Sequence, residues 1–264
     1  MGLLDRLKHL TTSAGTSPLT PAHTVTLIKD RAGTPAVDLT KLRRDGHIDL
    51  AKRADTAGIA LQKRGLAGIR AQVVLVLDHS ASMHTDYRHG HVQTLVERVL
   101  AFAMQVDVDG LVPVIPFDTH VRPDVATTVH TYPGVVDREI WHPQGMGSTN
   151  LTAALHTVQT LAADTDQPLL AAIVTDGDPN NKQTATRAVA ELSRYPVFLK
   201  ILAIRDVPYL AQLDDMRADL RLVDNVDTKT FPQPATITDL QFADAMADEW
   251  PTWITAATRA GVLA

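Results

Sequence analysis

Four apolar runs are the most regular feature of the chain's hydrophobic pattern. They cover residues 71–78, 111–117, 169–175 and 197–204. Amphipathic stretches with helical spacing lie between and after them, at residues 92–104, about 149–163, 182–194 and 207–218. Largely apolar runs of this length are typical of strands that are buried on both faces. Strands that alternate with helices predict an α/β fold in which helices flank a doubly wound, mainly parallel, Rossmann-like sheet.

Weaker patterns complete this part of the chain. Pro113 and Pro116 interrupt the second apolar run, and because proline is poorly tolerated in central strands we expect this strand near a sheet edge. The remaining elements that we predict are a short polar strand within 119–130, a short strand at 220–224, and one or two helices at 238–261 that hold Trp250 and Trp253 in the core.

Residues 1–66 have a different pattern and are predicted to form an N-terminal extension to a domain at 67–264. The extension begins with a short amphipathic helix at 2–10, followed by a Ser-, Thr- and Pro-rich linker. Four segments then share the order β-branched residue, x, Leu, x, Lys: residues 25–29, 37–41, 48–52 and 59–63. Apolar residues two apart predict short, half-exposed strands that pair with one another, lie on the main domain or join a partner's sheet. The alternative is an accidental match within a linker.

Composition narrows the classes of protein. The chain has 264 residues, of which 45% are hydrophobic, and a net charge of -5, so we expect a well-packed core and no general attraction to nucleic acid. Without cysteine there are no disulfides or thiolate metal sites, which is compatible with a reducing cytoplasm. No apolar run approaches a membrane span, and Arg6 departs from a myristoylation signal. We predict a cytoplasmic protein without stable membrane insertion.

Oxygen-bearing side chains gather where the predicted strands end. Asp78, Ser80 and Ser82 follow the first apolar run, Thr149 opens a helix, and Asp176 follows the third run. The loops after parallel strands meet at one edge of the sheet, so these five residues can converge. Hydroxyl and carboxylate oxygens suit a hard divalent cation. Mg²⁺ fits this set best, with Ca²⁺ or Mn²⁺ as alternatives.

The three motifs together resemble a known family. Asp78-His79-Ser80-Ala81-Ser82, Gly147-Ser148-Thr149-Asn150 and Thr175-Asp176-Gly177 resemble the metal-ion-dependent adhesion site of von Willebrand factor type A (vWA) domains, over about residues 70–225. The resemblance implies that Asp78, Ser80, Ser82, Thr149 and Asp176 are the metal ligands, and that one coordination position is left open for an acidic group of a partner protein. It implies a binding protein and not an enzyme.

A narrower resemblance concerns the segments around these motifs. Lys63-Arg64-Gly65-Leu66, the strand Val112 to Phe117 and the Trp-containing tail resemble bacterial vWA proteins associated with tellurium-resistance (Ter) stress systems. This implies a role in a Ter-type stress response, with another Ter-type protein as a candidate partner. The sequence leaves the oligomeric state open.

Two other functions stay open at this point. The same oxygen ligands could hold Mg²⁺ against a phosphate in a hydrolase such as a phosphatase, although no P-loop or Gly-x-Ser-x-Gly motif is present. Alternatively, the N-terminal repeats could do the binding in a scaffold protein.

The histidines and two further carboxylates complete the candidates. His84, His89 and His91 lack the spacing of a zinc site. We therefore expect them, with His79 and His142, to line the rim that faces a partner. Asp118 and Asp178 could orient metal-bound water or simply cap loops.

Overall fold

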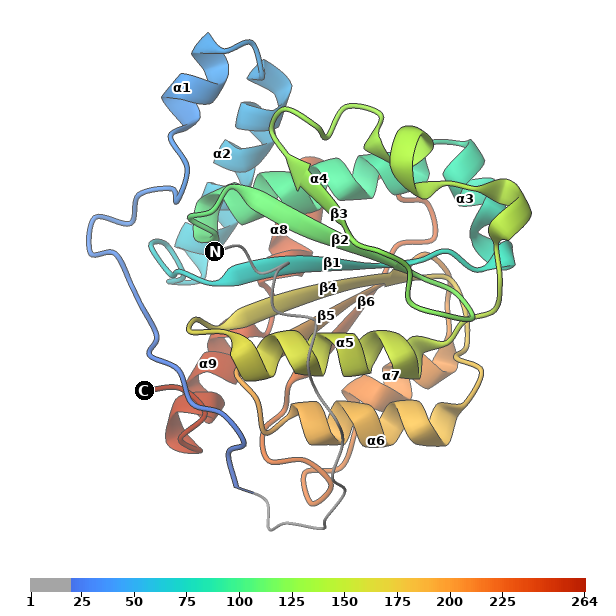
Figure 1. The fold of residues 1–264 in the computed structure, drawn as a ribbon. Coiled ribbons are helices and arrows are strands. Elements are labelled where there is room, and N and C mark those ends of the chain that lie inside the picture. The colour runs from blue at the N-terminus through green and yellow to red at the C-terminus, as the bar shows by residue number, and fades with distance from the viewer. Residues whose placement is uncertain (1–19) are drawn as a thin grey trace.

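The computed structural model describes residues 20–264 of the protein (Figure 1). A six-stranded sheet in the order β3-β2-β1-β4-β5-β6 forms its centre. The strands are β1 (Gln72–Asp78), β2 (Leu111–Phe117), β3 (Val125–Thr128), β4 (Leu169–Thr175), β5 (Val197–Ala203) and β6 (Val226–Thr230). Every neighbouring pair is parallel except β2 with β3. The predicted α/β class with a mainly parallel sheet is confirmed.

Helices cover both faces of the sheet because its central strands are apolar on both sides. In β1, Val73, Leu75 and Leu77 enter one core, whereas Val74 and Val76 enter the other. The first core is covered by α1 (Leu39–Arg44), α2 (Ile48–Lys63), α3 (His84–Arg88), α4 (His91–Val106), α8 (Asp239–Ala247) and α9 (Trp250–Arg259). The second is covered by α5 (Leu151–Asp164), α6 (Lys182–Leu192) and α7 (Pro208–Asp214), which lie below the sheet in Figure 1.

Strand β1 lies where the direction of winding reverses. Its register runs against β2 on one side, with Leu75 opposite Val114, and against β4 on the other, with Val76 opposite Ile173. The chain therefore leaves β1 toward one half of the sheet and returns on its other side. Loops diverge at such a switch point, and ligands of open α/β sheets bind there.

The prolines and tryptophans occupy the positions expected for them. Strand β2 is second from the edge, and Pro113 lies opposite Ala126 of the edge strand β3. Trp250 and Trp253 are each 1% exposed in the first core. The prediction of a short strand at 220–224 is wrong, because the sixth strand, β6, begins at Val226. Its polar Asp-Thr-Lys-Thr sequence hid it from a search for apolar runs.

The prediction that the Leu-x-Lys repeats form short β segments is also wrong. The third and fourth repeats lie in the single helix α2, and the second opens α1, where the Asp38 carboxylate caps the helix. Eleven residues make about three helical turns, so a repeat of that length returns to the same face of a helix. Leu50 and Leu61 are accordingly buried, whereas Ile48 and Ile59 are 51% and 59% exposed.

The buried alanines of α2 complete its apolar face and are the sequence signal for this helix. They are Ala51, Ala54, Ala57 and Ala60. This face packs against α4 and α8, so the segment before residue 67 shares a core with the rest of the chain. The division of the chain at 66/67 stays a prediction.

The first repeat has an extended conformation without a regular strand. Val25 bridges to Leu263 and Lys29 bridges to Ile69. The helix predicted at 2–10 lies outside the described residues. Within the part of the chain that the structure describes, no helix combines the length and the apolar character needed to cross a membrane.

Candidate metal site

Asp78 ends β1 at the carboxyl edge of the sheet and is completely buried. Its Oδ1 accepts the backbone N–H of Ser80 at 2.8 Å. Its Oδ2 accepts the hydroxyl of Thr175, the last residue of β4, at 2.5 Å. This carboxylate therefore joins the ends of two neighbouring strands that are far apart in the sequence.

Two serine hydroxyls extend this link to the second predicted carboxylate. The Oγ atoms of Ser80 and Ser82 lie 3.1 Å apart, within hydrogen-bonding distance. Ser82 Oγ donates to Asp176 Oδ1 at 2.7 Å across a separation of 94 residues. Asp78, Ser80, Ser82 and Asp176 thus form one connected group of oxygen atoms, as the strand-end pattern predicted.

The loop before α5 brings Thr149 beside this group through its backbone. Gly147 forms a parallel bridge with Ser80, and its carbonyl accepts the N–H of Ala81 at 2.9 Å. The carbonyl of Thr149 accepts the N–H of Asn180 at 2.8 Å. The loop is therefore fixed to the loops after β1 and β4. The structure positions the backbone of Thr149, and its hydroxyl stays a predicted ligand.

Gly147 is required for this close approach. A Cβ atom at this position would lie 2.5 Å from Thr119 Oγ1 and 3.1 Å from Asp118 Cγ. Both neighbours belong to the loop after β2. A side chain at residue 147 would therefore push the loop before α5 away from the site.

The donor set and its surroundings fit a hard cation. Asp78, Ser80 and Asp176 are 0%, 2% and 5% exposed, whereas Ser82 is exposed, so the group is buried at its base and open to solvent at one side. Burial raises the pKa of Asp78, and hydrogen bonds from Thr175 and Ser80 oppose this shift. Among residues 20–264, Asp78 forms no ion pair with a basic side chain. A divalent cation would supply this missing positive charge.

Arg205 lies at the same site and was not among the residues predicted from the sequence. It follows β5, and its guanidinium forms an ion pair with Asp176. Its second terminal nitrogen donates to Asp86 of α3 at 3.2 Å. The strand-end rule that selected Asp78 and Asp176 would have selected Arg205 too if it had been applied to basic residues after the run at 197–204.

His79 is buried, so its predicted place on the partner-facing rim is wrong. Its Nδ1 lies 3.4 Å from Asp118 Oδ2, and its Nε2 accepts the N–H of His142 at 3.3 Å. Burial lowers the pKa of His79, although Asp118 opposes the shift. The imidazole therefore connects the loop after β1 to two other loops of the site. The motif that predicted the metal ligands does not use His79, so it gave no indication of this role.

Asp118 and Asp178, the two further carboxylates, have different surroundings. Asp118 is 4% exposed and accepts Arg122 Nε at 2.8 Å. Burial acts to raise the pKa of Asp118, but Arg122, the backbone N–H of His120 and His79 together outweigh this and lower the pKa. Asp178 forms an exposed ion pair with Lys182 at 2.7 Å. Asp118 is therefore buried among the loops around the predicted ligands, whereas the side chain of Asp178 is half exposed.

The other histidines have the following surroundings. The rings of His84 and Trp141 lie 5.8 Å apart, and His91 Nδ1 lies 3.0 Å from Asp86 Oδ1. Within the described chain, His84, His89 and His91 do not converge with carboxylates into a three-ligand group. Their contribution to a partner-facing rim stays a prediction.

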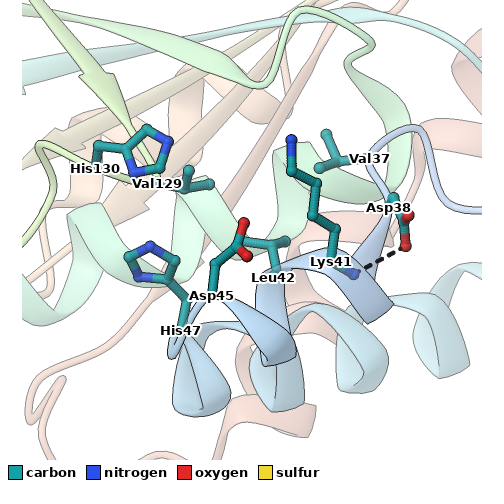
Figure 2. Close-up of a pocket in the computed structure, with 8 residues that line it drawn as sticks. All are labelled: Val37, Asp38, Lys41, Leu42, Asp45, His47, Val129 and His130. Carbon is teal, nitrogen blue, oxygen red and sulfur yellow. Dashed lines mark hydrogen bonds between the residues drawn. The ribbon is translucent and has the colours of Figure 1, made fainter.

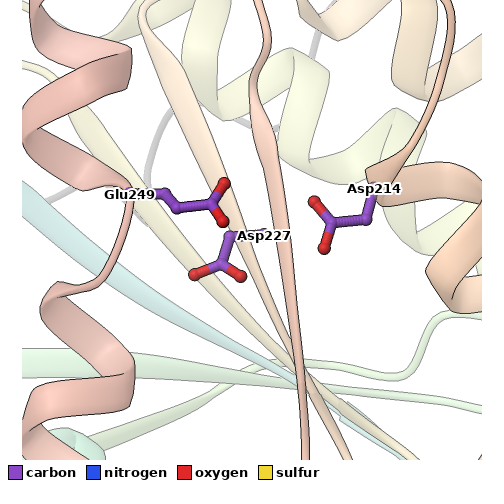
Figure 3. A group of neighbouring side chains, drawn as sticks. All are labelled: Asp214, Asp227 and Glu249. Atoms are coloured by element: carbon purple, nitrogen blue, oxygen red, sulfur yellow. The ribbon is translucent and has the colours of Figure 1, made fainter.

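A separate carboxylate cluster lies at the edge strand β6 (Figure 3). Asp214, Asp227 and Glu249 have oxygen atoms within 4.8 Å of one another. Asp227, however, already forms ion pairs with Lys200 and Lys229. These ammonium groups supply the positive charge that a metal would bring, so the cluster is explained without a metal.

A pocket of about 290 Å³ lies between α1 and the segment after β3 (Figure 2). His47 and His130 lie next to each other at one side of it, with ring centroids 5.6 Å apart. Asp38, Lys41 and Asp45 line the same pocket. Opposite charges therefore alternate around it, and it shows no convergent set of donors for one ligand.

Comparison with known proteins places the chain in a family. The doubly wound sheet with β1 at the switch point is the fold of a vWA domain. The family model described as "vWA found in TerF C terminus" matches residues 70–263, so the chain belongs to this vWA-TerF-like family. It is 29% identical over 222 residues to the uncharacterized protein YcbR of Bacillus subtilis, a match that covers 82% of this chain and 90% of YcbR.

One solved structure has a similar fold. Proximal thread matrix protein 1 from the mussel byssus superposes with a TM-score of 0.50 at 17% identity. The match covers 67% of this chain and 47% of the mussel protein, so this chain spans a little under half of that protein's length. At this identity the likeness shows the fold alone.

Proposed function

We propose that this protein is a divalent-cation-dependent protein-interaction module of a Ter-type stress-response system in the bacterial cytoplasm. Membership of the vWA family supports a metal-dependent interaction module in general. The observation that carries the proposal is the hydrogen-bonded group of Asp78, Ser80, Ser82 and Asp176 at the switch point, buried at its base and open at Ser82. The Ter setting is supported by the family to which the chain belongs.

The proposed ligands are Asp78, Ser80, Ser82, Thr149 and Asp176. All five offer oxygen, which favours Mg²⁺ and keeps Ca²⁺ and Mn²⁺ as alternatives. When bound, the cation supplies an open coordination position that favours a carboxylate oxygen. The proposed partner accordingly presents an acidic side chain and could be another Ter-type protein.

We propose a binding role and not an enzymatic one. The imidazole next to Asp78, His79, is buried and has both ring nitrogens engaged, with Asp118 and with the backbone of His142. It is therefore not available as a general base. This supports recognition over hydrolysis.

Calorimetric titration with MgCl₂ and MnCl₂ tests the metal site. The wild-type protein is expected to bind one cation, and Asp78→Ala is expected to abolish binding. Asp109→Ala is the matched control, because this exposed carboxylate lies before β2, at the opposite edge of the sheet. Binding that survives in Asp78→Ala would contradict the proposed ligand set.

Partner capture tests the interaction. The wild-type chain and the Asp78→Ala and Asp109→Ala variants are immobilised and exposed to a lysate of the source cell with MgCl₂ or with EDTA. A specific partner is expected only with wild type and Asp109→Ala in MgCl₂. Equal capture of the partner in EDTA and in MgCl₂ would contradict the metal-dependent part of the proposal and favour binding by another surface.

An assay for phosphate-ester hydrolysis tests the alternative function. Generic phosphate esters are incubated with the wild-type chain and with Ser80→Ala in MgCl₂. We expect no turnover from either. Sustained turnover that Ser80→Ala abolishes would establish a hydrolase.

A further inference from the structure

Arg205 places a positive charge on the predicted metal site. One terminal nitrogen of its guanidinium forms an ion pair with Asp176, and the other donates to Asp86. Asp176 and Asp86 are 5% and 6% exposed, whereas the Arg205 side chain is 47% exposed. A half-exposed guanidinium therefore connects two buried carboxylates, one of which is a predicted ligand.

The two oxygens of Asp176 are both occupied in this arrangement. Oδ1 accepts Ser82 Oγ, and Oδ2 is held by Arg205. A divalent cation that binds the hydroxyl of Ser82 and the carboxylate of Asp176 competes with both contacts. Like charges this close repel each other, so the guanidinium and the cation do not share Asp176 without a cost in free energy.

Asp86 provides a second position for the guanidinium. It belongs to α3, which directly follows the loop that carries Ser80 and Ser82. Its other oxygen lies 3.0 Å from His91 Nδ1, so the carboxylate stays fixed whether or not Arg205 contacts Asp176. The arginine can therefore leave one carboxylate and remain bound to the other.

We propose that Arg205 is an internal competitor of the divalent cation: it neutralises Asp176 in the metal-free protein and leaves Asp176 when the cation binds. This inference rests on the proposed function, since it concerns the same site. Two consequences follow. The competition raises the cation concentration at which the site fills, and the segment after β5 changes its contacts when it does.

Titration of Arg205→Gln with MgCl₂ tests the competition. The variant is expected to bind roughly twofold to tenfold more tightly than wild type, a modest factor because the guanidinium is half exposed and screened by water. Arg217→Gln is the matched control: it removes the same charge from an exposed ion pair with Asp219 and is expected to bind as wild type does.

The Nε–H resonance of Arg205 in ¹⁵N nuclear magnetic resonance spectra tests its departure. In the wild-type protein this resonance is expected to move on saturation with MgCl₂, because the guanidinium exchanges an ion pair for water. In Asp78→Ala it is expected to stay in place. This measurement follows the native side chain, so it does not depend on the folding of Arg205→Gln.

The outcomes separate this inference from the proposed function. Cation binding by wild type, with equal or weaker binding by Arg205→Gln and a stationary Arg205 resonance, overturns the competition and leaves the metal site intact. Absence of binding by both proteins overturns the metal site, and the competition with it.

Discussion

The hydroxyl of Ser82 donates to the carboxylate of Asp176 at 2.7 Å and joins loops that are 94 residues apart in the sequence. The contact exists because β1 and β4 are parallel neighbours whose carboxyl ends lie at the same edge. Regular structure positions both residues. Ser82 lies in a 3₁₀ turn (Ala81–Met83), and Asp176 directly follows β4. The fold therefore presents both oxygens before any ligand binds.

Ser82→Ala is expected to weaken Mg²⁺ binding by at least roughly tenfold, the lower range seen when even indirect metal contacts are removed. The variant loses both a predicted ligand and the hydrogen bond that orients Asp176. Thermal unfolding with and without MgCl₂ measures the effect, because a ligand that binds only the folded state raises its stability. Thr85→Ala changes an exposed hydroxyl in the neighbouring helix α3 and serves as the control. A Mg²⁺-dependent rise in stability equal to that of wild type would show that Ser82 is not a ligand.

Gly147→Ala is expected to lower both Mg²⁺ affinity and the free energy of unfolding, the latter by about 1–3 kcal/mol, as is typical of overpacked sites. The added methyl group would lie 2.5 Å from Thr119 Oγ1 and would displace the loop that carries Thr149. Gly145→Ala is the matched control, since its nearest neighbour is the end of the flexible Arg122 side chain at 3.2 Å. Urea unfolding and Mg²⁺ titration of both variants make the comparison. Equal behaviour of the two would show that the loop accommodates a side chain at residue 147.

Asp107 is expected to make the protein less stable as the pH rises. Its carboxylate is 4% exposed and accepts the N–H of Val73 at 2.8 Å, and burial raises its pKa from 3.8 to about 6. A raised pKa means that the folded state holds the proton more tightly. The resulting stabilisation is complete below pH 3.8 and is lost as the pH passes through about 6. The loss amounts to on the order of 3 kcal/mol.

Urea unfolding of wild type and Asp107→Asn between pH 4 and pH 7.5 measures this effect. The neutral variant lacks the titration, so its stability relative to wild type should increase across this range. Asp137→Asn, at an exposed carboxyl that does not act on the pKa of Asp107, is expected to keep the wild-type dependence. Parallel curves for wild type and Asp107→Asn would contradict the assignment.

Lys200→Met is expected to lower the free energy of unfolding by about 3 kcal/mol. Lys200 and Asp227 are both completely buried and form an ion pair across β5 and β6, and removal of one partner leaves a buried charge less well compensated. The double variant with Asp227→Asn should recover part of the loss. Lys182→Met, which breaks the exposed pair with Asp178, should cost less than about 1 kcal/mol. Equal effects of Lys200→Met and Lys182→Met in urea unfolding would show that the buried pair contributes no more than a surface pair.

The sequence by itself determined the four apolar strands of the sheet and four of the residues that meet at its carboxyl edge. The continuous apolar runs required strands buried on both faces, and the alternation with helices required parallel pairing. Since parallel strands end at one edge, polar residues directly after them, such as Asp78 and Asp176, had to lie close together. This inference needed only the direction of the strands.

Only the tertiary structure decided that residues 48–63 form a helix and that the positive charge of Arg205 lies at the predicted metal site. The spacing of Ile48 and Leu50 fits a strand, whereas the eleven-residue repeat fits a helix. The burial of Leu50 and Leu61 against α4 and α8 selects the helix. The ion pair of Arg205 with Asp176 likewise depends on which strand lies next to β4. Sequence spacing specifies neither, because strand order and the packing of α2 arise from contacts between distant segments.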